Sequence, residues 1–302
     1  MELDQLKLLL NEFGENVRFE YDLKKKNWFN IGGKVKVFYK ANNLNELVIF
    51  LKKLKNKEKI FILGAGSNTL ISDNLFDGAV IKLSKDFNNI SLLGKDIIIA
   101  GSAVLDKTLS EFAKENELSG FEFLSCIPGT IGGGITMNAG CFGKEFKDIL
   151  ISIQAIDKSG NVITIPSKDI KFEYRKNNLP KDLIFLSASF RGKKASREDI
   201  TNMINELKHQ KDKNQPTKIK TSGSTFKNPI TQTKKKVWEL IKESVPPNQK
   251  FGDACISEKH YNFFVNKGNA TFEDMTKLID FVSQKVLEKT GISLEKEIKI
   301  LE

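Results

Sequence analysis

The apolar residues follow two different periods along the chain, and this pattern predicts a protein of mixed helices and strands. Short apolar runs typical of strands lie at 36–40, 59–63, 79–83, 96–101, 149–157, 161–166, 183–192, 262–266 and 292–301. Apolar residues at helical spacing lie at 2–13, 43–55, 104–117, 196–214, 234–244 and 271–290. Lys158, Ser159 and Gly160 separate two of the strands and predict a hairpin turn. The helix at 196–214 is mostly polar, so we expect it to connect two domains.

The length and composition of the chain are those of a soluble protein with two domains. At 302 residues the chain exceeds the size at which one hydrophobic core usually keeps growing. Hydrophobic residues make up 40% and charged residues 28%, both ordinary for a globular protein. No apolar run is long enough to cross a bilayer, and residues 1–13 carry neither a basic leader nor a small-residue cleavage site. We therefore expect a cytoplasmic protein that does not bind membranes.

The formal net charge of +10 at pH 7 suggests nucleic-acid binding, but the kind of basic residue argues against it. Arginine is the preferred residue for base edges and for two-point phosphate contacts. Only four arginines are present: Arg18, Arg175, Arg191 and Arg197. The lysines are dispersed along the chain, which is typical of a solvated surface. We expect no nucleic-acid partner, and each of the few arginines becomes a candidate for a specific role.

The three cysteines give no sign of a metal site or a disulfide framework. Cys126, Cys141 and Cys255 are widely separated, odd in number and never paired as CxxC. We interpret them as buried or neutral thiols, and we expect no metal.

Three glycine-rich segments in the first half of the chain predict an anion-binding site. They are FNIGGK at 29–34, FILGAGSNTL at 61–70 and CIPGTIGGGITMNAGCFG at 126–143. Glycine permits positive φ and lets backbone N–H groups approach an anion closely, so such loops can hold a pyrophosphate. None of the three is a standard nucleotide motif, and each one alone is as consistent with a tight turn. Three together, with few acidic residues, favour one large anionic cofactor.

Seven motifs occur in an order that resembles one enzyme family. They are NIGG, LGAGSN, IPGTIGGGITMNAGCFG, FEYR, GSTFKNP, SEKHYNFFVN and LEKEI. In this order they are similar to the UDP-N-acetylenolpyruvoylglucosamine reductases, also called UDP-N-acetylmuramate dehydrogenases, of bacterial peptidoglycan synthesis. The resemblance extends from about residue 27 to residue 302 and is most specific where GSTFKNP is followed by a late LExE. The length resembles the shorter of the family's two structural types.

The resemblance implies an α+β fold. It consists of a two-lobed FAD-binding domain of the PCMH or vanillyl-alcohol-oxidase type and a C-terminal α+β substrate-binding domain. We expect an N-terminal helix at 1–26, FAD-binding lobes at about 27–84 and 85–193, and a substrate-binding domain at 194–302. The last strand is expected to pack back on the first lobe.

The resemblance also implies the reaction and its cofactor. FAD is the expected cofactor, and NADPH is the co-substrate that donates the hydride to reduce an enol ether, UDP-N-acetylglucosamine enolpyruvate. We expect a monomer with only small-molecule partners. The cofactor-binding residues carried over from the family's motifs are Asn30, Gly32, Gly33, Gly64, Ala65, Gly66, Ser67, Asn68, Pro128, Gly129, Thr130, Gly132, Gly133, Asn138 and Gly140.

Three residues match the family's catalytic positions. Ser224 matches the proton donor; a serine is a poor acid, but it needs only to be less basic than the carbon it protonates. Arg175 matches a residue held against the substrate carboxylate, for which its planar fork is suited. Glu297 matches the third, and strand alternation places Glu295 on the same side, so the choice between the two rests on the resemblance. The alternatives are a turn hydroxyl for Ser224, a surface ion pair of Arg175 with Glu173, and an exposed carboxylate for Glu297.

Three more residues match substrate-contacting positions or neighbour them. Asn228 lies in the same loop as Ser224, His260 lies in SEKHYNFFVN, and Tyr174 precedes the candidate arginine. A packing tyrosine and a strand-capping histidine would look the same in the sequence.

The chain departs from the family's usual residues at four positions near these motifs. The family usually has glycine at Cys126, commonly alanine at Gly134, a hydroxyl residue at Asn27 and a serine near Asn177. The residues at 244–256 also differ, so the contacts to the substrate's nucleotide are open there.

Two other functions remain as alternatives. Another FAD oxidoreductase of the same superfamily would share the glycine loops without needing the catalytic serine and glutamate together. A non-enzymatic polyanion-binding protein would use the basic surface, and it would purify without colour.

Overall fold

The protein is described by a computed structural model that covers residues 11–54, 59–217 and 219–302. The chain forms two compact units: the first lies within Met1–Phe19, Val37–Ala65 and Asp77–Lys211, and the second is Glu20–Lys36, Gly66–Phe76 and Asp212–Glu302. The units follow spatial contacts, so two N-terminal segments belong with the C-terminal part of the chain. Most of the helix predicted at 2–13 lies outside the described residues. No helix in the covered ranges is long and apolar enough to span a membrane.

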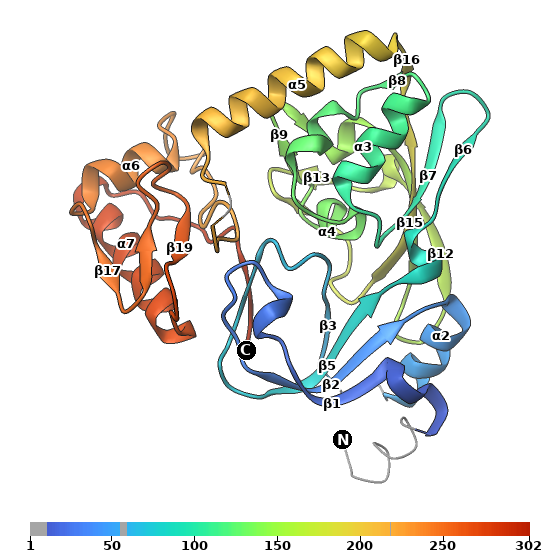
Figure 1. Ribbon diagram of the computed structural model, residues 1–302, viewed down its shortest axis with the longest axis horizontal. Helices are drawn as coiled ribbons and strands as arrows, with labels where there is room; N and C mark the ends of the chain where they lie inside the picture. The colour runs from blue at the N-terminus through green and yellow to red at the C-terminus, as the bar shows by residue number, and fades with distance from the viewer. Residues whose placement is uncertain (1–10, 55–58, 218) are drawn as a thin grey trace. The chain divides into compact units, whose positions relative to one another are not determined.

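The first unit contains a five-stranded antiparallel sheet (Figure 1). Its strand order is β12 (Val162–Pro166), β11 (Leu150–Ile156), β15 (Ile184–Arg191), β7 (Ile97–Gly101) and β6 (Ile90–Leu93). The predicted hairpin between β11 and β12 is present, and Gly160 adopts φ +90° in its turn. Helix α4 (Ile131–Thr136) packs against β15 and β7, and α3 (Asp106–Glu115) packs against the 3-10 helix η4 (Glu122–Cys126).

A second sheet has the order β1 (Val17–Asp22), β2 (Lys34–Ala41), β5 (Phe76–Leu83) and β3 (Ile60–Ile62). Helix α2 (Leu44–Lys53) begins at Asn43, whose side chain accepts a hydrogen bond from the Glu46 N–H. Its apolar face is buried in a core in which Tyr39 stacks on Phe50 at 3.9 Å. The strands predicted at 36–40, 59–63 and 79–83 and the helix predicted at 43–55 are therefore present. The N-terminal helix expected at 1–26 is wrong for 17–22, because that segment pairs with β2 as the edge strand β1.

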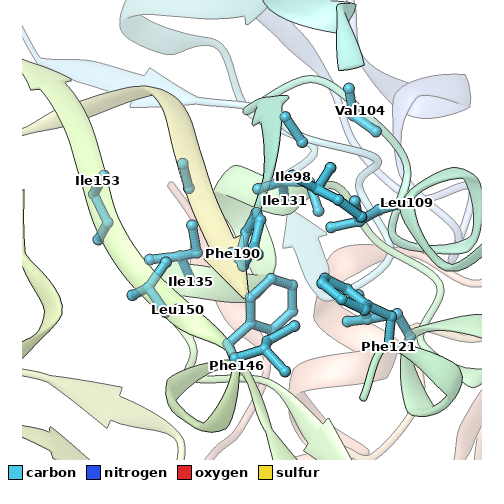
Figure 2. Packing of buried hydrophobic residues seen from close by; sticks show 14 of the residues in the cluster. Ile98, Val104, Leu109, Phe121, Ile131, Ile135, Phe146, Leu150, Ile153 and Phe190 are labelled. Atoms are coloured by element: carbon cyan, nitrogen blue, oxygen red, sulfur yellow. The ribbon is translucent and has the colours of Figure 1, made fainter. Parts of the chain in front are cut away.

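The core of the five-stranded sheet explains one departure from the family's usual residues. Phe146 packs edge-on against Phe190, with ring centroids 6.1 Å apart, and Figure 2 shows both rings in the cluster with Ile135 and Leu150. A Cβ atom at Gly134 would overlap the Phe146 ring. Glycine at this position is therefore matched to the phenylalanine beneath it.

Replacing Gly134 by alanine is expected to destabilise the protein. Alanine gains about 1 kcal/mol of helix propensity over glycine, whereas overpacking a dense core costs about 1–3 kcal/mol, so the net change is a loss. Urea unfolding measures it. Combining Gly134→Ala with Phe146→Leu should cost less than the sum of the single changes, because the smaller side chain makes room for the new methyl group. Strictly additive losses would contradict this account.

The second unit packs two helices against a small antiparallel sheet. The sheet is β17 (Lys250–Phe251), β18 (Ala254–Ile256) and β19 (Phe264–Asn266), and the helices are α6 (Val237–Ser244) and α7 (Phe272–Thr290). Helix α7 begins with a capping box at Thr271 and ends at Gly291, which adopts φ +71°. Strand β20 (Lys299–Leu301) runs parallel to β4 (Thr69–Ile71). The polar helix predicted at 196–214 is α5 (Arg197–Asn214).

The strand predicted at 292–301 is wrong over most of its length. Only β20 (Lys299–Leu301) is a strand there, preceded by a single bridge between Lys296 and Phe226. Residues 292–295 have no regular structure, because their backbone pairs only where it meets the segment around Phe226. The alternation argument for Glu295 and Glu297 therefore does not apply.

Candidate active site

A cavity of about 240 Å³ lies in the first unit, at two of the glycine-rich segments. Five of the predicted cofactor-binding residues line it: Gly64, Ala65, Thr130, Gly132 and Gly133. The rest of the wall includes Lys82, Ser102, Leu105, Thr136 and the 183–185 segment. The glycine loops at 61–70 and 126–143, which are far apart in the sequence, thus contribute to one hollow.

Close packing leaves little room for a side chain at two glycines in this wall. A Cβ atom at Gly64 would lie 2.7 Å from the Thr130 Oγ1 atom, and one at Gly132 would lie 3.1 Å from the Ser102 Cβ atom. Thr130 is also the N-cap of α4, where its hydroxyl oxygen accepts a hydrogen bond from the Gly133 N–H. Larger side chains would fill the space between the two loops.

Two polar residues of the wall were not predicted from the sequence. The Ser102 hydroxyl is buried and has no hydrogen-bond partner among the described residues. The Lys82 ammonium donates to the Gly64 carbonyl oxygen at 2.8 Å, which fixes the loop. The only sequence signal for Ser102 is its position directly after the strand that ends at Gly101, in a run of small residues. A buried hydroxyl without a partner is suited to a ligand that enters the cavity.

Asp106 lies behind the glycine loop and was also not predicted. Its carboxyl group is completely buried, and neither oxygen has a hydrogen-bond partner in the described chain. A Cβ atom at Gly129 would be 2.5 Å from the Asp106 Oδ2 atom, so the carboxyl group points at that glycine. Burial raises the pKa of Asp106 well above its usual value, which favours the protonated form.

This raised pKa predicts how stability changes with pH. Below the unfolded-state pKa of about 3.9, Asp106 is protonated in both the folded and the unfolded protein, so it does not make stability depend on pH. Above that pH the carboxyl group ionises only in the unfolded chain, and the free energy of unfolding falls by about 1.4 kcal/mol per pH unit. The free energy of unfolding continues to fall until the pH reaches the raised folded-state pKa of Asp106. Asp106→Asn removes this titration, so its stability relative to the wild type should rise with pH, as measured by urea unfolding from pH 4 to pH 8. Parallel curves would contradict the prediction.

A half-buried aspartate at the surface provides the control of opposite sign. Backbone hydrogen bonds, first from Asn161, lower the pKa of Asp157 in the β11–β12 turn. Asp157→Asn should therefore lose stability relative to the wild type as the pH rises from the lowered folded-state pKa to the unfolded-state value of about 3.9, since the fold favours the ionised form. Urea unfolding at pH values below about 4 measures this change.

The other predicted cofactor residues are divided between the two units. Pro128 and Gly129 precede α4 in the first unit, and Gly140 offers its carbonyl oxygen to Arg175. Asn138 is fully buried. Its side chain donates to Glu145 and to the Glu173 carbonyl oxygen, and it accepts from the Lys147 N–H. The remaining residues, Asn30, Gly32, Gly33, Gly66, Ser67 and Asn68, belong to the second unit.

Arg175 occupies a turn that orients its guanidinium group. The residue lies between β13 (Phe172–Glu173) and β14 (Lys176–Asn177) and adopts φ +57°, which is uncommon for a residue with a side chain. Its Nη2 atom donates to the Gly140 carbonyl oxygen at 2.8 Å, and its guanidinium carbon lies 5.0 Å from the centre of the Tyr174 ring. Glu173, the alternative ion-pair partner, is within ion-pair distance of Lys171 and Lys176.

Ser224 lies in a loop of the second unit that is fixed by backbone and amide bonds. Ser224 forms a bridge with Phe263, and the next residue, Thr225, donates its N–H to the Asn262 carbonyl oxygen. The buried Asn262 side chain accepts from the Phe226 N–H and donates to the Phe226 carbonyl oxygen. The bridge to Phe263, the Thr225 N–H and the two bonds of the Asn262 side chain thus hold the segment around Ser224. The half-buried Ser224 hydroxyl therefore has a defined position.

Glu297 lies beside this loop, and the structure distinguishes it from Glu295. The Glu297 N–H donates to the Thr225 carbonyl oxygen at 2.8 Å, and the Asn68 side chain donates to the Glu297 carbonyl oxygen at 3.1 Å. The Glu297 residue is half-buried. The Glu295 side chain is 74% exposed and pairs with Lys227 at 2.5 Å. Ser224 and Glu297 are therefore brought together, whereas Glu295 is a surface carboxylate.

His260 and Asn228 flank the serine loop. The His260 ring packs against Phe263, the bridge partner of Ser224, with centroids 4.6 Å apart. Burial lowers the pKa of His260, so the ring is neutral at pH 7; its Nδ1 atom accepts from the Asn262 N–H, which leaves the proton on Nε2. The Asn228 side-chain oxygen accepts from the Val237 N–H at the start of α6.

Comparison with known proteins places these features in a class. A family model for the FAD binding domain matches residues 35–166, which include both cavity-lining glycine loops. The fold and the cavity thus define an FAD-binding protein of α+β architecture. A second model, the C-terminal domain of UDP-N-acetylenolpyruvoylglucosamine reductase, matches residues 215–301, which include Ser224 and Glu297.

Relatives over the full length define the family. The chain is 65% identical over 301 residues to the UDP-N-acetylenolpyruvoylglucosamine reductase of Pelagibacter ubique, covering 100% of both chains. It is 46% identical to the reductase of Rickettsia conorii, covering 93% of this chain and 94% of that one. The crystal structure of the reductase of Thermus caldophilus matches with a TM-score of 0.82 at 29% identity, over 95% of this chain and 100% of that one. The chain belongs to the UDP-N-acetylenolpyruvoylglucosamine reductase family, so the sequence-based resemblance and fold class are confirmed.

Proposed function

We propose that this protein reduces UDP-N-acetylglucosamine enolpyruvate to UDP-N-acetylmuramate with NADPH as the hydride donor. The product serves bacterial peptidoglycan synthesis, and the proposed location is the cytoplasm. The observation that supports the proposal best is the fixed loop that holds Ser224 beside Glu297, in a chain whose other unit has a glycine-lined cavity. We further propose that the protein acts as a monomer.

The residues of the cavity fit FAD. The buried Ser102 hydroxyl without a partner and the closely packed glycines are what a large anionic group with many oxygens would need. Gly64, Ala65, Thr130, Gly132 and Gly133 would hold it, together with the other predicted cofactor residues. FAD, when bound, accepts a hydride from NADPH and supplies one to the enol ether.

Ser224 is the proposed proton donor. Reduction of the enol ether puts hydride on its terminal carbon and leaves negative charge on the neighbouring carbon and its carboxylate. The Ser224 hydroxyl donates its proton to that neighbouring carbon, and the rigid loop supplies the orientation that a weak acid requires. The Glu297 N–H donates to the Thr225 carbonyl oxygen of this loop. We propose that the Glu297 carboxyl group orients the Ser224 hydroxyl or stabilises the negative charge that develops on the substrate.

Arg175 is proposed to hold the substrate carboxylate. One N–H of its guanidinium is already engaged by the Gly140 carbonyl oxygen, which fixes the plane of the group. A planar guanidinium is suited to bond two carboxylate oxygens at once, and its charge persists at any working pH. Tyr174 supports the guanidinium through its ring.

His260 and Asn228 are proposed to contact the substrate. The neutral His260 ring presents an Nε2–H donor, since its Nδ1 atom is occupied by the Asn262 N–H. Asn228 is held at the start of α6, where its side-chain oxygen accepts from the Val237 N–H, and it lies in the same loop as Ser224.

A direct test is the absorbance of the purified protein. We expect a yellow protein that NADPH bleaches anaerobically and that the enolpyruvyl sugar nucleotide returns to yellow. Bleaching without recovery by the enol ether would indicate a different FAD oxidoreductase. A colourless preparation that does not take up added FAD, and that binds nucleic acid with salt-sensitive affinity, would instead support the polyanion-binding alternative.

A further inference from the structure

Two charged residues of the most specific motifs, Lys227 and Glu295, have no part in the reaction proposed above. Lys227 belongs to GSTFKNP, the motif of the Ser224 loop, and Glu295 is the first glutamate of LEKEI, the motif of Glu297. The Lys227 ammonium group donates to the Glu295 Oε1 atom at 2.5 Å, across 68 positions of the sequence. An ion pair therefore joins the two motifs.

Backbone contacts form a short ladder between the same two segments. The Lys227 N–H donates to the Glu295 carbonyl oxygen, and the Glu297 N–H donates to the Thr225 carbonyl oxygen, both at 2.8 Å. A single bridge lies between these two bonds. The ion pair closes one end of the ladder, whereas Glu297 and the Ser224–Thr225 backbone lie at the other. Two-stranded pairings of this length are only marginally stable by themselves, so the side-chain contact matters.

The two side chains of the pair differ in exposure. The Lys227 side chain is 12% exposed, whereas the Glu295 side chain is 74% exposed. A nearly buried ammonium group loses most of its hydration, and a carboxylate at hydrogen-bond distance compensates for that loss. The packed Lys227 thus fixes the position of Glu295 and of the backbone that leads to Glu297.

We propose that Lys227 and Glu295 are a positioning pair that fixes the register of the Glu297 segment against the Ser224 loop. Without the ion pair, the ladder keeps only its backbone bonds and its bridge, so the segment opens more often. Glu297 then spends less time beside the serine loop. The effect on catalysis rests on the proposed function, whereas the effect on the ladder is a property of the fold.

The test variants remove the pair from either side. Lys227→Met removes the ammonium group and keeps a long side chain, and Glu295→Gln removes the charge and keeps the shape. Lys296→Met is the matched control, because Lys296 lies in the same segment but pairs with Asp280 of α7 at 3.4 Å. The Lys296 and Asp280 side chains are 42% and 69% exposed, and such a surface pair contributes little.

The first test is native-state hydrogen exchange of the FAD-loaded protein, followed by mass spectrometry, and it does not depend on the proposed function. Peptides that cover 293–299 should exchange about three- to tenfold faster in Lys227→Met and in Glu295→Gln than in the wild type. The double variant should exchange no faster than the more affected single variant, because both changes remove one interaction. Lys296→Met should exchange at nearly the wild-type rate. Unchanged exchange in the two pair variants, additive effects, or an equal increase in Lys296→Met would overturn the proposal.

The second test measures the two half-reactions and rests on the proposed function. Reoxidation of the reduced enzyme by the enol ether should slow about three- to tenfold in Lys227→Met and in Glu295→Gln, whereas reduction by NADPH should keep its wild-type rate. Lys296→Met should leave both rates unchanged. Faster exchange without slower reoxidation, or equal slowing of both half-reactions, would overturn the effect on catalysis. A wild-type protein that the enol ether does not reoxidise would count against the proposed function alone, since the exchange result stands by itself.

Discussion

Ser224→Ala is expected to slow reoxidation of the reduced enzyme by the enol ether about 10²–10⁴-fold, the usual contribution of a positioned general acid. Reduction by NADPH should stay near its wild-type rate, because no proton from Ser224 is needed in that half-reaction. The loop should keep its fold, since Asn262 and Phe263 hold it through groups other than the Ser224 hydroxyl. Anaerobic stopped-flow absorbance separates the two half-reactions.

Ser222 provides the matched control in the same loop. Its hydroxyl donates to the Thr69 carbonyl oxygen at 3.3 Å, and the residue is buried. Ser222→Ala should therefore cost about 1 kcal/mol of stability, the usual value for a hydrogen bond, and leave the ratio of the two half-reactions unchanged. Equal slowing of both half-reactions in Ser224→Ala, or equal effects of the two variants, would remove Ser224 from its proposed role.

Arg175→Lys is expected to lower turnover about 10- to 100-fold, although the charge is retained. A lysine ammonium can still reach a carboxylate, but it lacks the planar fork, and it cannot bond the Gly140 carbonyl oxygen and two carboxylate oxygens in one plane. The loss of one or two charge-assisted hydrogen bonds, at about 1.5–3 kcal/mol each, accounts for this range. Steady-state kinetics with the enol ether as the varied substrate measure the effect.

Arg191 is the control for the arginine change. Its side chain is 61% exposed and lies 3.3 Å from Asp96 in a surface ion pair, which contributes little to stability. Arg191→Lys should therefore leave turnover and stability close to wild type. Near-normal turnover of Arg175→Lys would show that the fork geometry is not needed and would exclude Arg175 from carboxylate binding.

The secondary structure was largely predictable because it depends on local periods. The alternating run at 183–192 became the central strand β15, and the amphipathic stretch at 271–290 became α7 with the cap residues Thr271 and Gly291 at its ends. Propensity, caps and apolar spacing act over a few residues, so one sequence suffices to find them. The prediction failed at 292–298, where the backbone follows a distant segment and not its own pattern.

The candidate site was predictable only where residue types occur in family motifs. Ser224, Arg175 and Glu297 were identified from motifs, and their roles remain proposals. Ser102 and Asp106 lie in a segment without a motif, and nothing local to the sequence shows that their polar atoms are buried without partners. Burial is a property of what packs around a residue, so it had to come from the fold.

The sequence by itself determined the mixed helix and strand content, the family and the glycine loops, because these depend on local patterns and on motifs that can be read in order. The tertiary structure alone decided which long-range neighbours meet. It distinguished the exposed Glu295 from the half-buried Glu297, brought two of the glycine loops to one cavity and placed the Glu297 N–H on the Thr225 carbonyl oxygen. Such contacts arise between segments far apart in the chain, and no local pattern of one sequence specifies them.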